Sequence, residues 1–163
     1  MSGTIIMLLS GAAAIGCGLI AGLFFAFSVF IMKALGAIPA NEGVAAMQSI
    51  NAAIVKTSFM PVFFGTGLLG AALAVLAIMR SGPGASMLIA GGLLYILGTL
   101  AVTMIFNVPL NNKLAAFASA SPEAAKVWTA YLKDWTVWNH VRTAASTAAC
   151  AAYIVAIAAM ARG

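Results

Sequence analysis

The amino-acid sequence predicts an all-α fold, a four-helix transmembrane bundle with a short amphipathic helix between spans one and two and a long helix leading into span four. Hydrophobic residues make up 64% of the chain and charged residues only 7%, and the mean hydropathy is +1.10, so this is not the composition of a water-soluble domain. Four apolar stretches are long enough to cross a bilayer: residues 4–32, 57–79, 85–106 and 139–161. We expect residues 1–163 to form a single integral membrane domain.

The positive net charge does not indicate a nucleic-acid partner. The charge of +5 comes from eight Lys and Arg residues that are scattered singly rather than gathered in a basic run. Single basic residues at the ends of membrane spans are the usual cause of such a balance. The expected partner is therefore membrane lipid.

The first span contains Gly18 and Gly22 in GxxxG spacing and several phenylalanines near its end. Small residues let helices approach closely, so the two glycines favour either packing within the bundle or a homo-oligomer formed through this face. Phe24 and Phe27 are either core or lipid-facing residues, or they line a cavity for a flat ligand.

The segment after the first span predicts an amphipathic helix. Pro39 and Asn41 are typical of a helix start, with Asn41 as the capping residue. One face of this helix then carries, at helical spacing, Val44, Met47, Asn51 and Ile54. Because Asn51 interrupts an apolar stripe, it either forms a hydrogen bond inside the bundle or faces a ligand.

Spans two and three are joined by the short turn Arg80–Gly84 and should form an antiparallel hairpin. After span three we expect a break or kink at Pro109, which lacks a backbone donor. Asn107, Asn111 and Asn112 cluster around this proline. They either satisfy backbone groups at the membrane boundary or contribute to a site.

The long helix that leads into span four is predicted to begin at Ser121. Ser121 is the N-cap, Pro122 is a first-turn proline, and the carboxylate of Glu123 is favourable near the positive end of the helix dipole. At 100° per residue, an arc of roughly 100° on this helix collects Trp128, Tyr131, Trp135, Trp138, Asn139 and Arg142. Arg142 begins a span, so it must reach the interface, pair with Asp134 or face a cavity. His140, the single histidine, lies about 100° from Asn139 on this helix.

The ionisable residues exclude several kinds of site. One histidine and the two remote cysteines, Cys17 and Cys150, supply no set of metal ligands, so no metal is expected, although a single axial haem ligand stays open. The absence of a CxxC motif argues against a thiol–disulfide oxidoreductase. The spans carry no chain of carboxylates, which argues against a proton-coupled transporter.

Two short motifs carry a resemblance to a known family. PLNNKL at 109–114, followed by W-x-x-x-N-x-x-R at 135–142, resembles the anthrone oxygenase-like family of small four-span membrane proteins. In that family a Pro-x-Asn-x-x-Leu element precedes a Trp, an Asn and an Arg at similar spacing. The resemblance implies an oxygenase that acts on a lipophilic polycyclic aromatic with O₂ and without a metal or other cofactor. It also implies a location in the bacterial inner (plasma) membrane.

Under this resemblance each site residue has an expected role. Arg142 would stabilise an oxyanion, Asn111 and Asn139 would orient carbonyl or phenol oxygens, and Trp135 would be a stacking wall. His140 has suitable acid–base chemistry but lies on another helical face, so the base is not identified. The further residues expected to bind substrate are Trp138, Asn51, Asn107 and Tyr131. The alternative is a non-catalytic membrane protein that binds a quinone-like or lipid ligand or a partner helix.

Overall fold

The computed structural model describes residues 3–162, and the described residues form helices and no strand. In chain order the elements are α1 Gly3–Ala26, η1 Phe27–Ile31, α2 Met32–Ala37, α3 Ala40–Ile54, α4 Phe59–Arg80, α5 Ala85–Tyr95, η2 Ile96–Ala101, η3 Thr103–Asn107, α6 Val108–Ala115 and α7 Pro122–Met160. They join into four continuous helices that are long and apolar enough to cross a membrane: Gly3–Ala37, Phe59–Arg80, Ala85–Ala115 and Pro122–Met160. The predicted all-α four-span bundle, with a helix between spans one and two, is confirmed.

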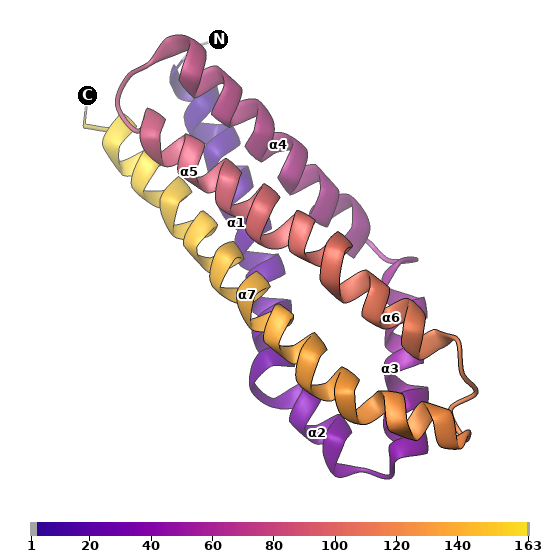
Figure 1. Ribbon diagram of the computed structural model, residues 1–163. Helices are drawn as coiled ribbons and strands as arrows, with labels where there is room; N and C mark the ends of the chain where they lie inside the picture. The colour runs from indigo at the N-terminus through magenta and orange to yellow at the C-terminus, as the bar shows by residue number, and fades with distance from the viewer. Residues whose placement is uncertain (1–2, 163) are drawn as a thin grey trace.

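The four long helices run side by side along the bundle (Figure 1). The start of α1, the turn between α4 and α5 and the end of α7 lie at one end, while α2, α3, α6 and the first turns of α7 lie at the other. α7 packs against both α1 and α5, and α3 packs against α2, α6 and α7. Helix α3, which is the predicted amphipathic helix, therefore closes the end of the bundle where the polar residues of the sequence gather.

Buried apolar side chains form two clusters along the bundle. The cluster nearer the chain ends includes Cys17, Phe63 and Tyr153. The ring of Tyr153 needs Gly91, because a Cβ at Gly91 would lie 2.9 Å from that ring. The second cluster, around α3 and the start of α7, includes Met47 and Trp128 among its members. The candidate site described below is bounded by residues of both clusters.

The expected break at Pro109 does not occur. Helix α6 follows directly on the π-helical segments η2 and η3, and the whole of Ala85–Ala115 is continuous. A π-helical turn is wider than an α-helical one, so the helix passes a residue that lacks an N–H group without ending. Of the expected break or kink at Pro109, the break is wrong, because the wider turn of η3 accommodates the proline within a continuous helix.

The two predicted helix starts have different outcomes. Ser121 caps α7 as expected, since its Oγ accepts a hydrogen bond of 3.1 Å from the Ala124 amide. Helix α3 instead begins one residue before Asn41, and its N-cap is Pro39, which forms no side-chain cap. Asn41 is exposed in the first turn, so the expectation that it caps α3 was wrong.

Candidate functional site

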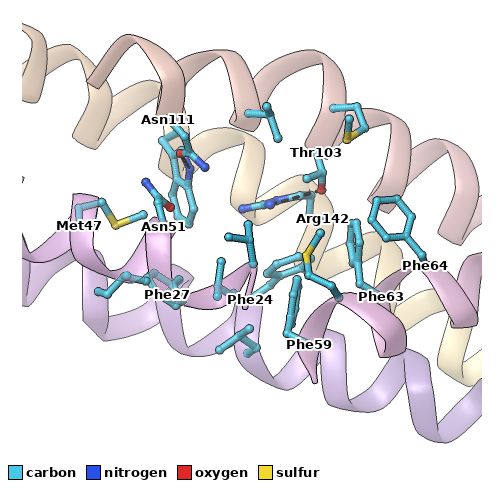
Figure 2. A pocket seen from close by; sticks show the side chains of 18 residues that line it. Phe24, Phe27, Met47, Asn51, Phe59, Phe63, Phe64, Thr103, Asn111 and Arg142 are labelled. Carbon is cyan, nitrogen blue, oxygen red and sulfur yellow. Dashed lines mark hydrogen bonds between the residues drawn. The ribbon is translucent and has the colours of Figure 1, made fainter. Parts of the chain in front are cut away.

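A pocket lies inside the bundle at the end closed by α3. Its volume is about 140 Å³, and its walls come from α1, η1, α3, α4, η3, α6 and α7. Aromatic walls include Phe24, Phe27, Phe59, Phe63 and Trp135, and the polar lining residues are Asn51, Thr103, Asn111 and Arg142. Figure 2 shows Asn51 and Asn111 at one end, the phenylalanines of α4 at the other and Arg142 between them. The pocket is thus an aromatic chamber with a few placed polar groups, which is typical of a small-molecule site.

Arg142 projects its guanidinium into this pocket from the middle of α7 (Figure 2). Nη2 donates a hydrogen bond of 2.7 Å to Asn139 Oδ1, and Nη1 donates one of 3.3 Å to Thr103 Oγ1. The guanidinium carbon lies 4.1 Å from the centre of the Phe24 ring and 5.0 Å from that of Trp135. Two polar contacts and two aromatic rings therefore hold the group in place.

The charge of Arg142 is not balanced by a carboxylate. The side chain is only 4% exposed, and its Nε is buried without a hydrogen-bond partner. Asp134, the partner considered from the sequence, is exposed and borders a surface groove beside Pro109 and Trp138 instead. Within residues 3–162, Arg142 forms no ion pair. A buried cation without a counter-charge is unfavourable by several kcal/mol, so the pocket is suited to a ligand that carries negative charge on oxygen.

Asn139 positions Arg142 instead of reaching the pocket. Its Nδ2 donates to the backbone oxygen of Phe24 and to Ser28 Oγ, both at 2.7 Å, while its Oδ1 accepts from Arg142. Both amide hydrogens and the oxygen are therefore engaged. The expected direct contact between Asn139 and a ligand oxygen does not fit this geometry, because every polar group of this side chain is already used within the protein.

Asn111 presents a donor to the pocket. Its Oδ1 accepts hydrogen bonds from the Tyr131 hydroxyl at 2.7 Å and from Trp135 Nε1 at 2.8 Å. An indole N–H can only donate, so the amide atom that faces Trp135 must be the oxygen. The Nδ2 of Asn111, a pocket-lining residue, is left to donate to a ligand. Asn51 adds a second amide at the same end (Figure 2).

The comparisons with known proteins bear on this arrangement. A family model described as anthrone oxygenase matches residues 59–152, which is more than half of the chain. The chain belongs to the anthrone oxygenase family. No curated protein matches it significantly, and no solved structure does either. The matched segment supplies Arg142, Asn139, Trp135, Asn111 and Thr103, whereas the walls from α1 and α3 lie outside it.

Several residues that the sequence associated with the site lie elsewhere in this anthrone oxygenase family member. His140 is exposed and borders a surface groove with Lys33, because it projects from a different face of α7. Trp138 stacks on Phe106, with ring centres 3.6 Å apart, at the outer edge of the predicted arc. Neither side chain lines the pocket, so the expectations that His140 is a catalytic group and Trp138 a substrate contact do not fit the geometry.

Asn107 and Tyr131 support the site of this anthrone oxygenase family member from behind. Asn107 is fully buried, and its Nδ2 donates to the backbone oxygen of Trp135 at 3.1 Å. Tyr131 is buried between Trp128 and Trp135, and its hydroxyl bonds to Asn111. Neither residue lines the pocket, contrary to the expectation that both bind substrate directly.

Sequence reasoning missed part of the pocket of this anthrone oxygenase family member. Phe59 and Phe63 of α4 form one aromatic end and stack with ring centres 5.3 Å apart. Thr103 holds Arg142 and donates its own hydrogen to the backbone oxygen of Thr99 at 2.7 Å. Phenylalanines and threonines are ordinary residues of an apolar span, so nothing in the sequence marked these positions. For metals, the described residues contain no group of three His, Cys, Asp or Glu side chains that could hold an ion.

The pocket opens on an apolar side of the bundle. Three of its lining residues, Val55, Phe64 and Met104, are large hydrophobic side chains that are exposed on the protein surface. They come from the end of α3, from α4 and from η3. In a bilayer such a rim favours contact with acyl chains over water, so it suits entry of a lipophilic ligand from the membrane.

Proposed function

We propose that this anthrone oxygenase family member oxidises a lipophilic polycyclic aromatic, of the anthrone kind, to a quinone with O₂. The observation that carries the proposal is Arg142, a buried cation without a counter-charge inside a chamber of aromatic rings. An anthrone is flat and apolar, and loss of a methylene proton leaves an anion whose charge is delocalised onto its oxygen. The pocket complements both properties.

Arg142 would act on the step in which charge develops. When the methylene proton leaves, the guanidinium stabilises the oxyanion. The N–H groups of Arg142 need little reorganisation for this, because Asn139 and Thr103 already hold the guanidinium in place. The electron-rich carbanion form then reduces O₂, and a carbon–oxygen bond forms at the former methylene carbon. Loss of water, which takes the second methylene hydrogen, leaves the new carbonyl. One oxygen atom ends in the quinone and the other in water, so no external reductant is required.

The pocket's dimensions fit this substrate only in part. A cavity of about 140 Å³ is close to the size that encloses one benzene ring. A tricyclic ligand would therefore place one ring inside, against Trp135 and Phe24, and extend its others through the apolar mouth at Phe64 and Met104. Exclusion of water from the inner part strengthens the interaction between the guanidinium and the oxyanion.

The lining residues that the structure describes include no carboxylate and no imidazole to take the methylene proton. In our proposal the proton leaves to water at the end of the pocket lined by Asn51 and Asn111, away from the apolar mouth, and stabilisation of the anion by Arg142 drives the transfer. The same feature favours a second candidate function, the binding of a quinone-like ligand without turnover. Quinone carbonyls accept hydrogen bonds. Arg142 Nε is a buried donor without a partner among residues 3–162, and Nδ2 is the donor that remains on Asn111 once its Oδ1 has bonded to Tyr131 and Trp135.

Oxygen uptake in lipid nanodiscs tests the proposal. Anthrone should be consumed together with one O₂ per quinone formed, and Arg142→Gln should lower kcat by roughly 10²–10³-fold. Lys113→Gln, which removes an exposed cation outside the pocket, is the matched control and should behave as the wild type. A visible spectrum recorded before substrate is added would reveal any bound chromophore. Turnover no faster than the spontaneous rate contradicts the oxygenase function, and Arg142-dependent quinone binding without turnover would support the second candidate.

A further inference from the structure

We propose that the pocket binds a monovalent anion at Arg142 when no aromatic ligand is present, and that the ligand's oxyanion displaces it. This inference rests on the geometry around Arg142, and only the displacement step rests on the proposed oxygenase function. The anion occupies the position that the substrate oxyanion would take.

The first argument is the charge of the resting pocket. Arg142 is 4% exposed, sits against the Phe24 ring and forms no ion pair within residues 3–162. The three acidic residues of the chain are Glu42, Glu123 and Asp134, and all are exposed and outside the pocket lining. A buried guanidinium without a counter-charge is strongly unfavourable, and a bound anion removes that penalty.

The second argument is that the polar groups left without a partner around Arg142 are donors, because the acceptors nearby are already used. Its Nε is buried and has no partner. The Thr103 hydroxyl gives its hydrogen to the Thr99 carbonyl, so its oxygen only accepts from Arg142. Asn111 turns its oxygen toward Trp135 and Tyr131 and its NH₂ group away from them. Because these donors lack acceptors, they are suited to an anion rather than to a cation or a neutral donor.

The surroundings restrict the anion to a weakly hydrated one of single charge. The walls are mostly apolar, so a divalent anion such as sulfate would lose more hydration than one guanidinium can replace. A halide and the carboxylate of a membrane fatty acid share the required chemistry. The carboxylate of the fatty acid would lie at Arg142. Its acyl chain would leave the pocket through the mouth that is lined by the exposed side chains of Val55, Phe64 and Met104.

Thermal unfolding in a non-ionic detergent tests the site without any turnover. Sodium bromide, compared with sodium sulfate at equal ionic strength, should raise the Tm of the wild type by about 5 °C when bromide is 100-fold above its dissociation constant. Lys113→Gln should show the same rise and Arg142→Gln none. Laurate compared with dodecanol is the second pair of probes, and it distinguishes a carboxylate from an acyl chain alone.

The outcomes separate the two sources of the anion. A rise with bromide supports an inorganic anion, and a rise with laurate but not with bromide or dodecanol supports a fatty-acid carboxylate. No Arg142-dependent rise with either anion overturns the proposal. If Arg142→Gln does not fold, saturable quenching of wild-type tryptophan fluorescence by iodide, reversed by bromide or laurate, gives the same decision, since Trp135 lies 5.0 Å from the guanidinium. Where turnover is present, bromide should raise KM and leave kcat unchanged; this arm alone depends on the oxygenase function.

Discussion

Asn139 Oδ1 accepts a hydrogen bond of 2.7 Å from Nη2 of Arg142, which lies three residues further along α7. The amide is itself tied to the first span through the Phe24 carbonyl and Ser28. Two helices that are distant in sequence therefore fix the direction of one guanidinium. This relationship gives the Asn-x-x-Arg spacing a physical meaning: the asparagine aims the arginine into the pocket.

Asn139→Leu should loosen Arg142 without removing its charge. We expect kcat for anthrone oxidation to fall about 10-fold, the effect of losing one charge-assisted hydrogen bond, while KM changes less. Steady-state oxygen uptake measures both constants. A mutant with unchanged kcat would mean that Asn139 serves packing alone.

Asn111→Asp should weaken ligand binding, because it keeps an oxygen for Trp135 Nε1 and Tyr131 but replaces the donor that faces the pocket. The expected effect is a rise of roughly 10-fold in the Kd of an anthraquinone, measured by quenching of tryptophan fluorescence. Asn112→Asp, at the exposed neighbouring position, is the control for the added charge. Equal affinities in both variants would show that Asn111 does not contact the ligand.

His140→Gln should leave turnover unchanged, since the imidazole is exposed and lines a different groove from the one that contains Arg142. The kcat of this variant, measured beside that of Arg142→Gln, checks the assignment. A fall of 100-fold or more, which is in the range expected on loss of a general base, would restore His140 as the base.

Met104→Trp should narrow the mouth of the pocket and lower kcat/KM for a tricyclic substrate, because Met104 lies on the exposed rim. Ile105→Trp adds the same bulk at the next exposed position, which does not line this pocket, and should have no effect. The ratio of kcat/KM values in lipid nanodiscs measures the difference. Equal losses in the two variants would place the entrance elsewhere.

Gly43→Ala should destabilise the docking of α3 against α7. A Cβ at Gly43 would lie 2.9 Å from the Trp128 ring and 2.7 Å from the Leu35 carbonyl oxygen. We expect a loss of about 1–3 kcal/mol, typical of overpacking, seen as a lower Tm. Gly11→Ala is the control, since a Cβ there meets nothing within 4 Å, and its Tm should be equal or higher. A Gly43→Ala protein as stable as the Gly11→Ala protein would contradict this packing.

The sequence was sufficient to predict the four spans and the buried face of α7. Its helical period places Trp128, Trp135, Asn139 and Arg142 on one face, and all four are buried. Contacts between helices are not contained in this pattern. A helical wheel carries no information on neighbouring elements, so it could not show that Trp138 at the edge of the arc stacks on Phe106.

The partners of the polar residues could not be predicted for the same reason. Asn139 Nδ2 donates to the Phe24 carbonyl at the end of α1 and to the Ser28 hydroxyl in η1. Both residues lie more than a hundred positions earlier in the chain. The sequence predicts a break or kink at Pro109 because the pattern of residues gives no sign of the π-helical turns before it. The apolar pattern predicts where the spans lie, whereas the site depends on packing between them.

The absorption spectrum of anthrone mixed with the protein under anaerobic conditions tests the central claim most directly. Without O₂ the reaction should stop at the bound anion, so wild-type protein should generate the absorption band of deprotonated anthrone, and admission of O₂ should convert it to quinone. Arg142→Gln should show neutral anthrone alone at the same pH. An anion band of equal strength in both proteins, or none in the wild type, would contradict the role of Arg142 in stabilising the oxyanion.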